Sequence, residues 1–143
     1  MNLHKIFLLV FSLSMTIMSK ADTVDNYQLY INNILVRNDS GFPNKSNQSN
    51  FLTLDKAVYN TTIDIYFNHC TGGATNRRII VVSRNKRNII GWQFPDENTQ
   101  PLMRVPISRI RDKIKTSDTE FYELYYYDDQ TKEGRLLTRF KIS

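Results

Sequence analysis

His69 and Cys70 are the residues in this chain whose types best fit nucleophilic catalysis, because a thiol needs a base to take its proton. The imidazole must come within hydrogen-bonding reach of the sulfur. Neighbours on an extended strand point to opposite faces, although a sharp turn into Thr71-Gly72-Gly73 would bring the two together. A serine triad would also have to use His69, and no G-x-S-x-G segment is present. The sequence therefore predicts no catalytic residue. The alternative is a small exported hydrolase that uses Cys70 with His69, or an unassigned carboxylate pair.

Asp128, Asp129 and Glu133 offer the oxygen ligands that calcium prefers, but the D-x-D-x-D-G loop pattern is absent. One histidine and one cysteine cannot complete a closed zinc site without carboxylates from elsewhere. We therefore predict no metal and no cofactor. Cys70 has no second cysteine to pair with, so we expect it to be a buried small apolar residue, with an intermolecular bridge as the alternative.

Positive charge is concentrated in the middle of the chain. Residues 77–115 carry ten basic and three acidic residues, whereas residues 22–76 and 116–143 each have a net charge of −2. The candidate contact residues are the basic side chains Arg84, Lys86, Arg87, Arg109 and Arg111. If the first three, at a predicted hairpin tip, lie near the last two, they form a patch that attracts an anionic partner such as an acidic protein, an anionic polysaccharide or glycolipid, or nucleic acid. The alternative is a set of solvated charges that discourages edge-to-edge aggregation.

Four tyrosines lie in one predicted strand, residues 121–127. Alternation places Tyr125 and Tyr127 on one face and Tyr122 and Tyr126 on the other. One pair should be core, and the other should be a partly exposed aromatic strip of the kind that proteins and sugars bind. Ordinary cross-strand packing is the alternative.

Period-two alternation and turn residues indicate the elements that must position these side chains. Asn32-Asn33 should form a two-residue turn, and Pro106 should mark the edge or end of a sheet. Ile107, Ile110 and Ile114 have helical spacing. The predicted strands are 27–36 (a hairpin), 61–68, 77–84, 89–94, 102–107, 121–127 and 135–142, with a polar loop over 37–50.

This spacing of short strands and turns predicts an all-β fold, namely an antiparallel β-sandwich of seven or eight strands with one short helical turn. We expect residues 22–143 to form it as a single domain. The segment Asp118-Thr119-Glu120-Phe121-Tyr122-Glu123-Leu124 resembles the D-x-x-x-Y-x-C stretch of immunoglobulin-like domains. The resemblance implies that Tyr122 forms the tyrosine corner and that Leu124 replaces the second cysteine. It also implies that Ile63 or Ile65 replaces the first cysteine and that Trp92 is the core tryptophan. A transthyretin-like sandwich or a small open barrel fits nearly as well.

The N-terminal residues have the pattern of a secretory signal. Lys5 precedes an uncharged apolar run over residues 6–18, and Ser19 and Ala21 are small residues at the minus-three and minus-one positions of a cut after Ala21. The run is shorter than the roughly 20 residues that a membrane span needs. We expect residues 1–21 to be removed and the protein to be secreted or periplasmic, with no transmembrane segment afterwards. Sequons at Asn38, Asn44, Asn47 and Asn60 could carry glycans in a eukaryotic pathway. In an Asn-rich chain such sequons also arise by chance, and a bacterium would usually leave them bare.

Together these features predict an exported, non-enzymatic binding or interaction module, with a subunit of an envelope or surface assembly as a further alternative. Arg84, Lys86 and Arg87 would supply the electrostatic contact. Reversing these three charges should weaken binding to an anionic partner and leave the melting temperature nearly unchanged.

Overall fold

The computed structural model describes residues 25–39, 51–54, 61–114 and 121–142. The predicted signal peptide, the sequons at Asn44, Asn47 and Asn60, and residues 118–120 lie outside these ranges, so they stay predictions; Asn38 is exposed on a strand. The elements of the described residues are β1 (Asn26–Ile31), β2 (Ile34–Asp39), β3 (Leu52–Leu54), β4 (Thr62–Asn68), β5 (Arg78–Ser83), β6 (Asn88–Gln93), β7 (Leu102–Pro106), α2 (Ile107–Arg111), β8 (Tyr122–Tyr127) and β9 (Arg135–Ile142).

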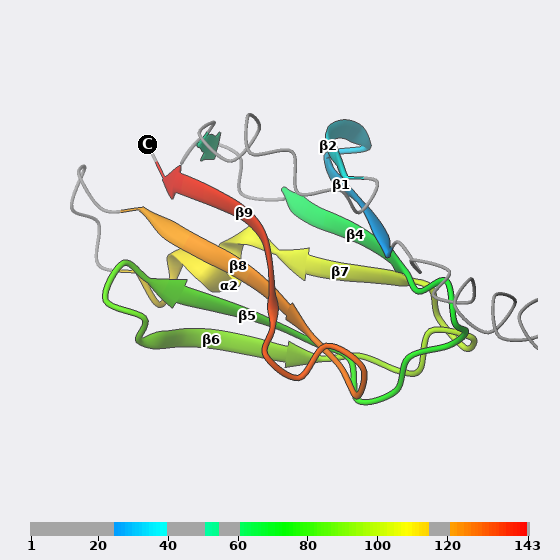
Figure 1. Cartoon of the computed structure of the whole chain (residues 1–143). Coiled ribbons are helices and arrows are strands. Elements are labelled where there is room, and N and C mark those ends of the chain that lie inside the picture. The colour runs from blue at the N-terminus through cyan, green and yellow to red at the C-terminus, as the bar shows by residue number, and fades with distance from the viewer. Residues whose placement is uncertain (1–24, 40–50, 55–60, 115–120, 143) are drawn as a thin grey trace, which may run out of the picture.

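These strands form two sheets, one ordered β2-β1-β4-β7 and the other β3-β9-β8-β5-β6. Neighbouring strands run antiparallel except for the parallel pair β3–β9. In Figure 1 the sheets form two layers, and α2 lies at the same end of the molecule as the turn between β5 and β6. The prediction of a mostly β protein with one helical turn is therefore confirmed.

A single hydrophobic core lies between the two sheets, because alternate residues of each strand point inward. The Phe67 and Tyr126 rings stack across it with centroids 4.0 Å apart. Tyr27 Oη crosses the same gap and donates to the Leu137 carbonyl at 2.6 Å. The helical turn closes one end of this core, where Ile107, Ile110 and Ile114 are buried as their spacing predicts.

The backbone conformation of the turns agrees with the residue types that predicted them. Asn32 and Asn33 both have positive φ, 50° and 63°, which a two-residue type I′ hairpin requires and asparagine tolerates. Lys86 in the β5–β6 turn also has a positive φ of 60°. Pro106 ends β7, an outer strand of its sheet, where its missing N–H costs no ladder hydrogen bond.

Two predictions about individual side chains are wrong. Cys70 is exposed rather than buried, because the inward alternation of β4 continues one step to His69 and then turns outward. Trp92 packs against the core but stays partly exposed, because it lies on β6 at the edge of its sheet. A core tryptophan would need a central strand.

Strand β3 was not predicted at all. It contains only three residues, and no clear turn signal follows it in the sequence. Nothing in the neighbouring residues therefore indicates its parallel pairing with β9. Among the described residues, none of the helical structure has the length and apolar character of a membrane span.

Candidate functional site

The outer face of β8 is built by alternation. Tyr122, Leu124 and Tyr126 point into the core, whereas Glu123, Tyr125 and Tyr127 point outward. The Tyr125 and Tyr127 rings lie 6.2 Å apart on that outer face and are half-buried. The predicted division of the four tyrosines into a core pair and a partly exposed pair is thus confirmed.

Cationic side chains lie over the aromatic rings of this sheet. This arrangement holds a flexible cation in place, since the ring face attracts positive charge. The pairs, measured from cation to ring centroid, are Lys86 over Tyr125 at 5.3 Å, Arg84 over Phe121 at 5.7 Å, Arg78 over Tyr127 at 5.7 Å and Lys141 over Phe51 at 5.3 Å.

Glu123 anchors two of the outward cations. Its side chain is buried, and it accepts hydrogen bonds from Lys86 Nζ and from Arg139 Nε, the latter at 2.9 Å. Lys86 Nζ also donates to Tyr125 Oη at 3.0 Å. Burial favours the neutral form of Glu123, but the hydrogen bonds from Lys86 and Arg139 outweigh it and hold the pKa of this carboxyl below its ordinary value.

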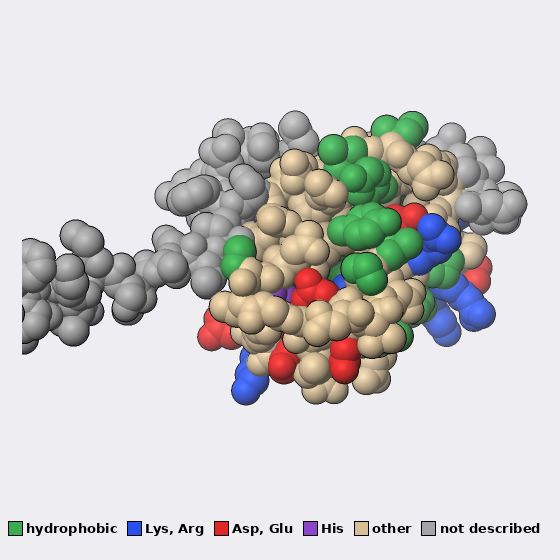
Figure 2. Space-filling model, turned by 90° about the vertical axis from the view of Figure 1, so that its right-hand side faces the viewer, with side chains coloured by type: hydrophobic (Ala, Val, Ile, Leu, Met, Phe, Trp, Pro, Cys, Tyr) green, Lys and Arg blue, Asp and Glu red, His purple; other side chains and the backbone are tan. Residues whose placement is uncertain are grey.

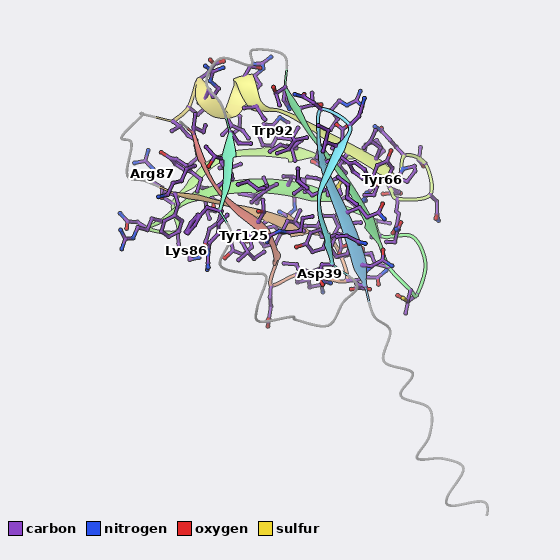
Figure 3. The ribbon with its side chains drawn as sticks, turned by 90° about the horizontal axis from the view of Figure 1, so that it is seen from above. Asp39, Tyr66, Lys86, Arg87, Trp92 and Tyr125 are labelled. Carbon is purple, nitrogen blue, oxygen red and sulfur yellow. The ribbon has the colours of Figure 1, made fainter. Side chains whose placement is uncertain are left out.

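The sheet ordered β3-β9-β8-β5-β6 carries a group of cations at the end where the β5–β6 turn lies. We call these cations, with the rings beneath them, the basic face. Its members are Arg84, Lys86, Arg87, Arg139, Lys141, Phe51, Phe121 and Tyr125. Arg84, Lys86 and Arg87 are exposed, and Figure 3 places Lys86 and Arg87 at the tip of the molecule, where Lys86 contacts Tyr125.

Arg109 and Arg111 extend the positive charge at the same end, from α2. Arg109 is exposed and Arg111 is half-buried with contacts of its own. The structure brings α2 and the β5–β6 turn to one end of the molecule (Figures 1 and 3), although they belong to different layers. The two groups of candidate residues therefore share an end.

Acidic side chains gather at the opposite end. There the loops after β6 and β8 carry five carboxylates, at Asp96, Glu97, Asp128, Asp129 and Glu133. Figure 2 views this end and shows acidic side chains spread over it. The described part of the chain is thus polarised along its strands, from a basic end to an acidic one.

Two arginines of the basic middle segment do not contribute to this surface. Arg77 is fully buried, and its guanidinium donates to the Gln100 carbonyl at 2.6 Å and the Pro101 carbonyl at 3.0 Å, which fastens the loop between β6 and β7. Arg104 lies on the other sheet, where it pairs with Asp64.

His69 is held by carboxylates and not by Cys70. Its Nε2 lies 2.5 Å from Asp128 Oδ2, and its Nδ1 lies 3.2 Å from Asp25 Oδ1. Asp128 also accepts the backbone N–H groups of Gln130 and Thr131, as the first residue of a turn does. Both ring nitrogens are therefore occupied, which leaves neither positioned to act on the exposed thiol, and Asp128 shapes a loop.

No protein-family model matches this sequence, and no curated protein matches it either.

The sequence missed the residues that organise the basic face. Alternation alone places Glu123 beside Tyr125, but its pairing with Arg139 depends on the β8–β9 register. The contact with Lys86 depends on how the β5–β6 turn folds back.

Proposed function

We propose that this protein is an exported, non-enzymatic binding module of the periplasm or extracellular space, which engages an anionic partner through its basic face. The proposal includes export by the predicted signal peptide, residues 1–21, and an immunoglobulin-like sandwich for the remainder. Strand order supports that fold. β4 pairs with β7 in one sheet and β8 lies between β5 and β9 in the other, with Tyr122 buried at the start of β8.

The observation that carries the proposal is that four of the five cations of the basic face are held in place before any partner arrives. Lys86 and Arg139 share one buried carboxylate, and Arg84 lies over Phe121. Ordering a long side chain on binding costs roughly 0.5–1.5 kcal/mol, so cations that are already ordered bind an anion at lower cost. The basic face has five cations and a single buried acid among them, Glu123, and it therefore keeps a strong net positive charge.

Within the basic face, Arg84 and Arg87 supply the charge that a partner meets, because both are exposed at the turn. Tyr125 and Phe121 supply flat apolar surface beside them. This combination suits a chain of anionic sugars or the headgroup of a glycolipid, whose rings lie on aromatic side chains while sulfate or phosphate groups meet guanidinium groups.

Lys86 has a structural role as well as its proposed role in binding, and this revises the outcome that the sequence predicts for the triple charge reversal. A glutamate at position 86 would face the buried Glu123, and the melting temperature would fall. The sharper variant is Arg84→Glu with Arg87→Glu, which leaves Lys86 and Glu123 intact.

The test measures binding of the purified protein to heparin, to lipopolysaccharide and to polyglutamate at several salt concentrations. We expect heparin or lipopolysaccharide to bind, with a salt-sensitive affinity that falls roughly tenfold in the double variant at an unchanged melting temperature. Arg87→Glu alone is matched against Lys132→Glu, an exposed charge at the acidic end, and only the first should weaken binding. Absence of binding to all three polyanions would remove the proposal, and so would equal losses in the two matched variants. Tighter binding of polyglutamate than of heparin or lipopolysaccharide would indicate that the partner is an acidic protein and not a glycan.

A further inference from the structure

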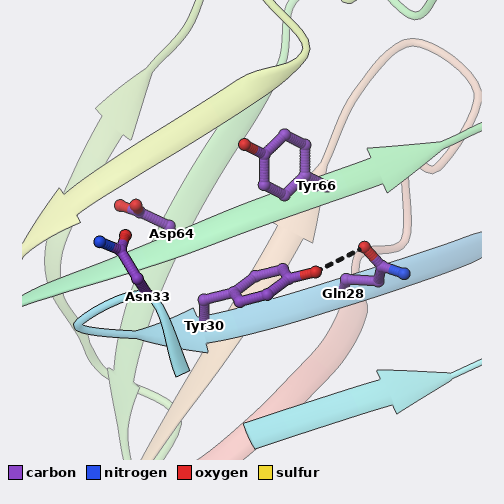
Figure 4. A pocket seen from close by; sticks show the side chains of 5 residues that line it. All are labelled: Gln28, Tyr30, Asn33, Asp64 and Tyr66. Carbon is purple, nitrogen blue, oxygen red and sulfur yellow. Dashed lines mark hydrogen bonds between the residues drawn. The ribbon is translucent and has the colours of Figure 1, made fainter. Parts of the chain in front are cut away.

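A small pocket lies on the outer face of the other sheet, away from the basic face. It has a volume of about 310 Å³ and is lined by Gln28, Tyr30, Asn33, Asp64 and Tyr66 (Figure 4). Ligand pockets of proteins begin at roughly 300 Å³, so this one has room for a small ligand.

The register of β1 and β4 assembles its floor. Gln28 lies opposite Tyr66, and Tyr30 lies opposite Asp64, so four outward side chains form a square on adjacent strands. Asn33 in the β1–β2 turn adds a wall, as Figure 4 shows. The β1–β2 pairing has a bulge between Leu29 and Tyr30. A bulge increases the local twist and bends the bulged strand.

The pocket combines two aromatic rings with amide groups. The Tyr30 and Tyr66 rings meet at 80° with centroids 5.8 Å apart, so they offer apolar surface in two directions. Tyr30 Oη donates to Gln28 Oε1 at 3.0 Å, which fixes both side chains. Within the described part of the chain, the Asn33 amide and the Tyr66 hydroxyl have no hydrogen-bond partner, so both can serve a ligand.

Asp64 brings acceptor oxygens without a free charge. Arg104 Nε donates to Oδ1 and Nη2 to Oδ2, both at 2.8 Å, in a bidentate pair. Hydrogen bonds from Arg104, and a further one from Thr62, hold the pKa of Asp64 below its ordinary value, so the carboxylate stays ionised and keeps one acceptor position for a ligand. Because Arg104 balances this charge, the pocket as a whole is close to neutral.

We propose that this pocket binds one ring of a neutral saccharide. Sugar rings have an apolar C–H face that lies against aromatic side chains and a rim of hydroxyls that amides and carboxylates hydrogen-bond. A lipid tail would leave these amides and the carboxylate without partners, and the balanced charge offers no preference to an ion. The proposal is independent of the basic face, which lies on the opposite layer.

The experiment titrates the purified, nitrogen-15-labelled protein with methyl glycosides of glucose, galactose, mannose and N-acetylglucosamine, and with adenosine, and follows the backbone amides by NMR. At least one glycoside should shift amides around residues 28–33 and 64–66. Tyr66→Ala should then weaken its binding by about tenfold, the loss expected for one aromatic face. Asn33→Gly, which keeps the positive φ of the turn, should weaken it by about fivefold through the lost hydrogen bonds.

Arg87→Glu is the matched control, because it removes a charge from the basic face and should leave glycoside binding unchanged. Tyr66→Ala should in turn leave heparin binding unchanged, so failure of the pocket and failure of the basic face are distinguishable. The proposal is overturned if none of the four glycosides binds, if the shifts fall elsewhere, or if Tyr66→Ala binds as well as the parent. Selective binding of adenosine would likewise overturn it.

Discussion

Glu123→Gln tests whether one buried carboxylate holds the basic face together. Glutamine keeps the shape of the side chain but removes its negative charge, so Lys86 and Arg139 lose their shared partner. Glu123 is only 2% exposed, and water therefore cannot replace the lost interactions at the carboxyl itself.

The expected cost follows from two charge-assisted hydrogen bonds, which are worth roughly 1.5–3 kcal/mol each when the partners are desolvated. The side chains of Lys86 and Arg139 are 62% and 34% exposed, so both bonds belong at or below the low end of that range. The glutamine oxygen keeps one acceptor. We therefore expect a loss of about 2 kcal/mol, which lowers the melting temperature of a domain of this size by roughly 8 °C.

Urea denaturation followed by tryptophan fluorescence measures this change, because Trp92 is the single tryptophan and packs against the core. Glu133→Gln is the control, since Glu133 is exposed in the β8–β9 loop and should cost nothing measurable. The difference should also depend on pH. The pKa of Glu123 is lowered on folding, so its contribution is complete above the ordinary value of 4.5 and disappears as the pH falls through the folded-state pKa.

Equal stability of Glu123→Gln and Glu133→Gln at neutral pH would mean that the buried carboxylate does not hold the basic face together. A stability difference that persisted unchanged in acid would refute the assignment of the effect to the ionised carboxylate.

The remaining predictions concern two glycines and the thiol. In Gly134→Ala, at a φ of 79°, the new methyl group overlaps the Tyr127 ring. In Gly72→Ala only the φ of 105° is unfavourable, because no atom lies within 4 Å of the new methyl group. Both should lose about 1–2 kcal/mol for the left-handed backbone, and Gly134→Ala should lose measurably more in urea melts; equal losses would contradict the packing of Tyr127 on this turn. Cys70 is exposed, so a thiol reagent should label the native protein about as fast as the urea-unfolded protein, and a native protein that resists labelling would contradict its position.

Local patterns predicted the elements well because strands and turns leave short-range signals. Ile63, Ile65 and Phe67 alternate along β4, Asn32-Asn33 supplies the positive φ of a hairpin, and Tyr122 and Tyr126 fall on the inner face of β8. Each follows from backbone geometry that neighbouring residues already determine.

Contacts between distant segments could not be predicted. Lys86 meets Glu123 across 37 residues, and His69 meets Asp128 across 59, and both depend on strand register and loop path. The charge count failed for a related reason. The count over residues 77–115 included Arg77, although burial between loop carbonyls removes this side chain from the surface. The pocket beside Tyr66 arises from pairing and a bulge that no local pattern announces.

NMR titration with a short heparin fragment decides whether the face built on β8 and the β5–β6 turn binds anions. We predict salt-sensitive shifts in the amides of residues 84–87, 123–127 and 139–141, and none in the acidic loops 94–101 and 128–134. Shifts confined to those acidic loops, or no shifts at low salt, would contradict it.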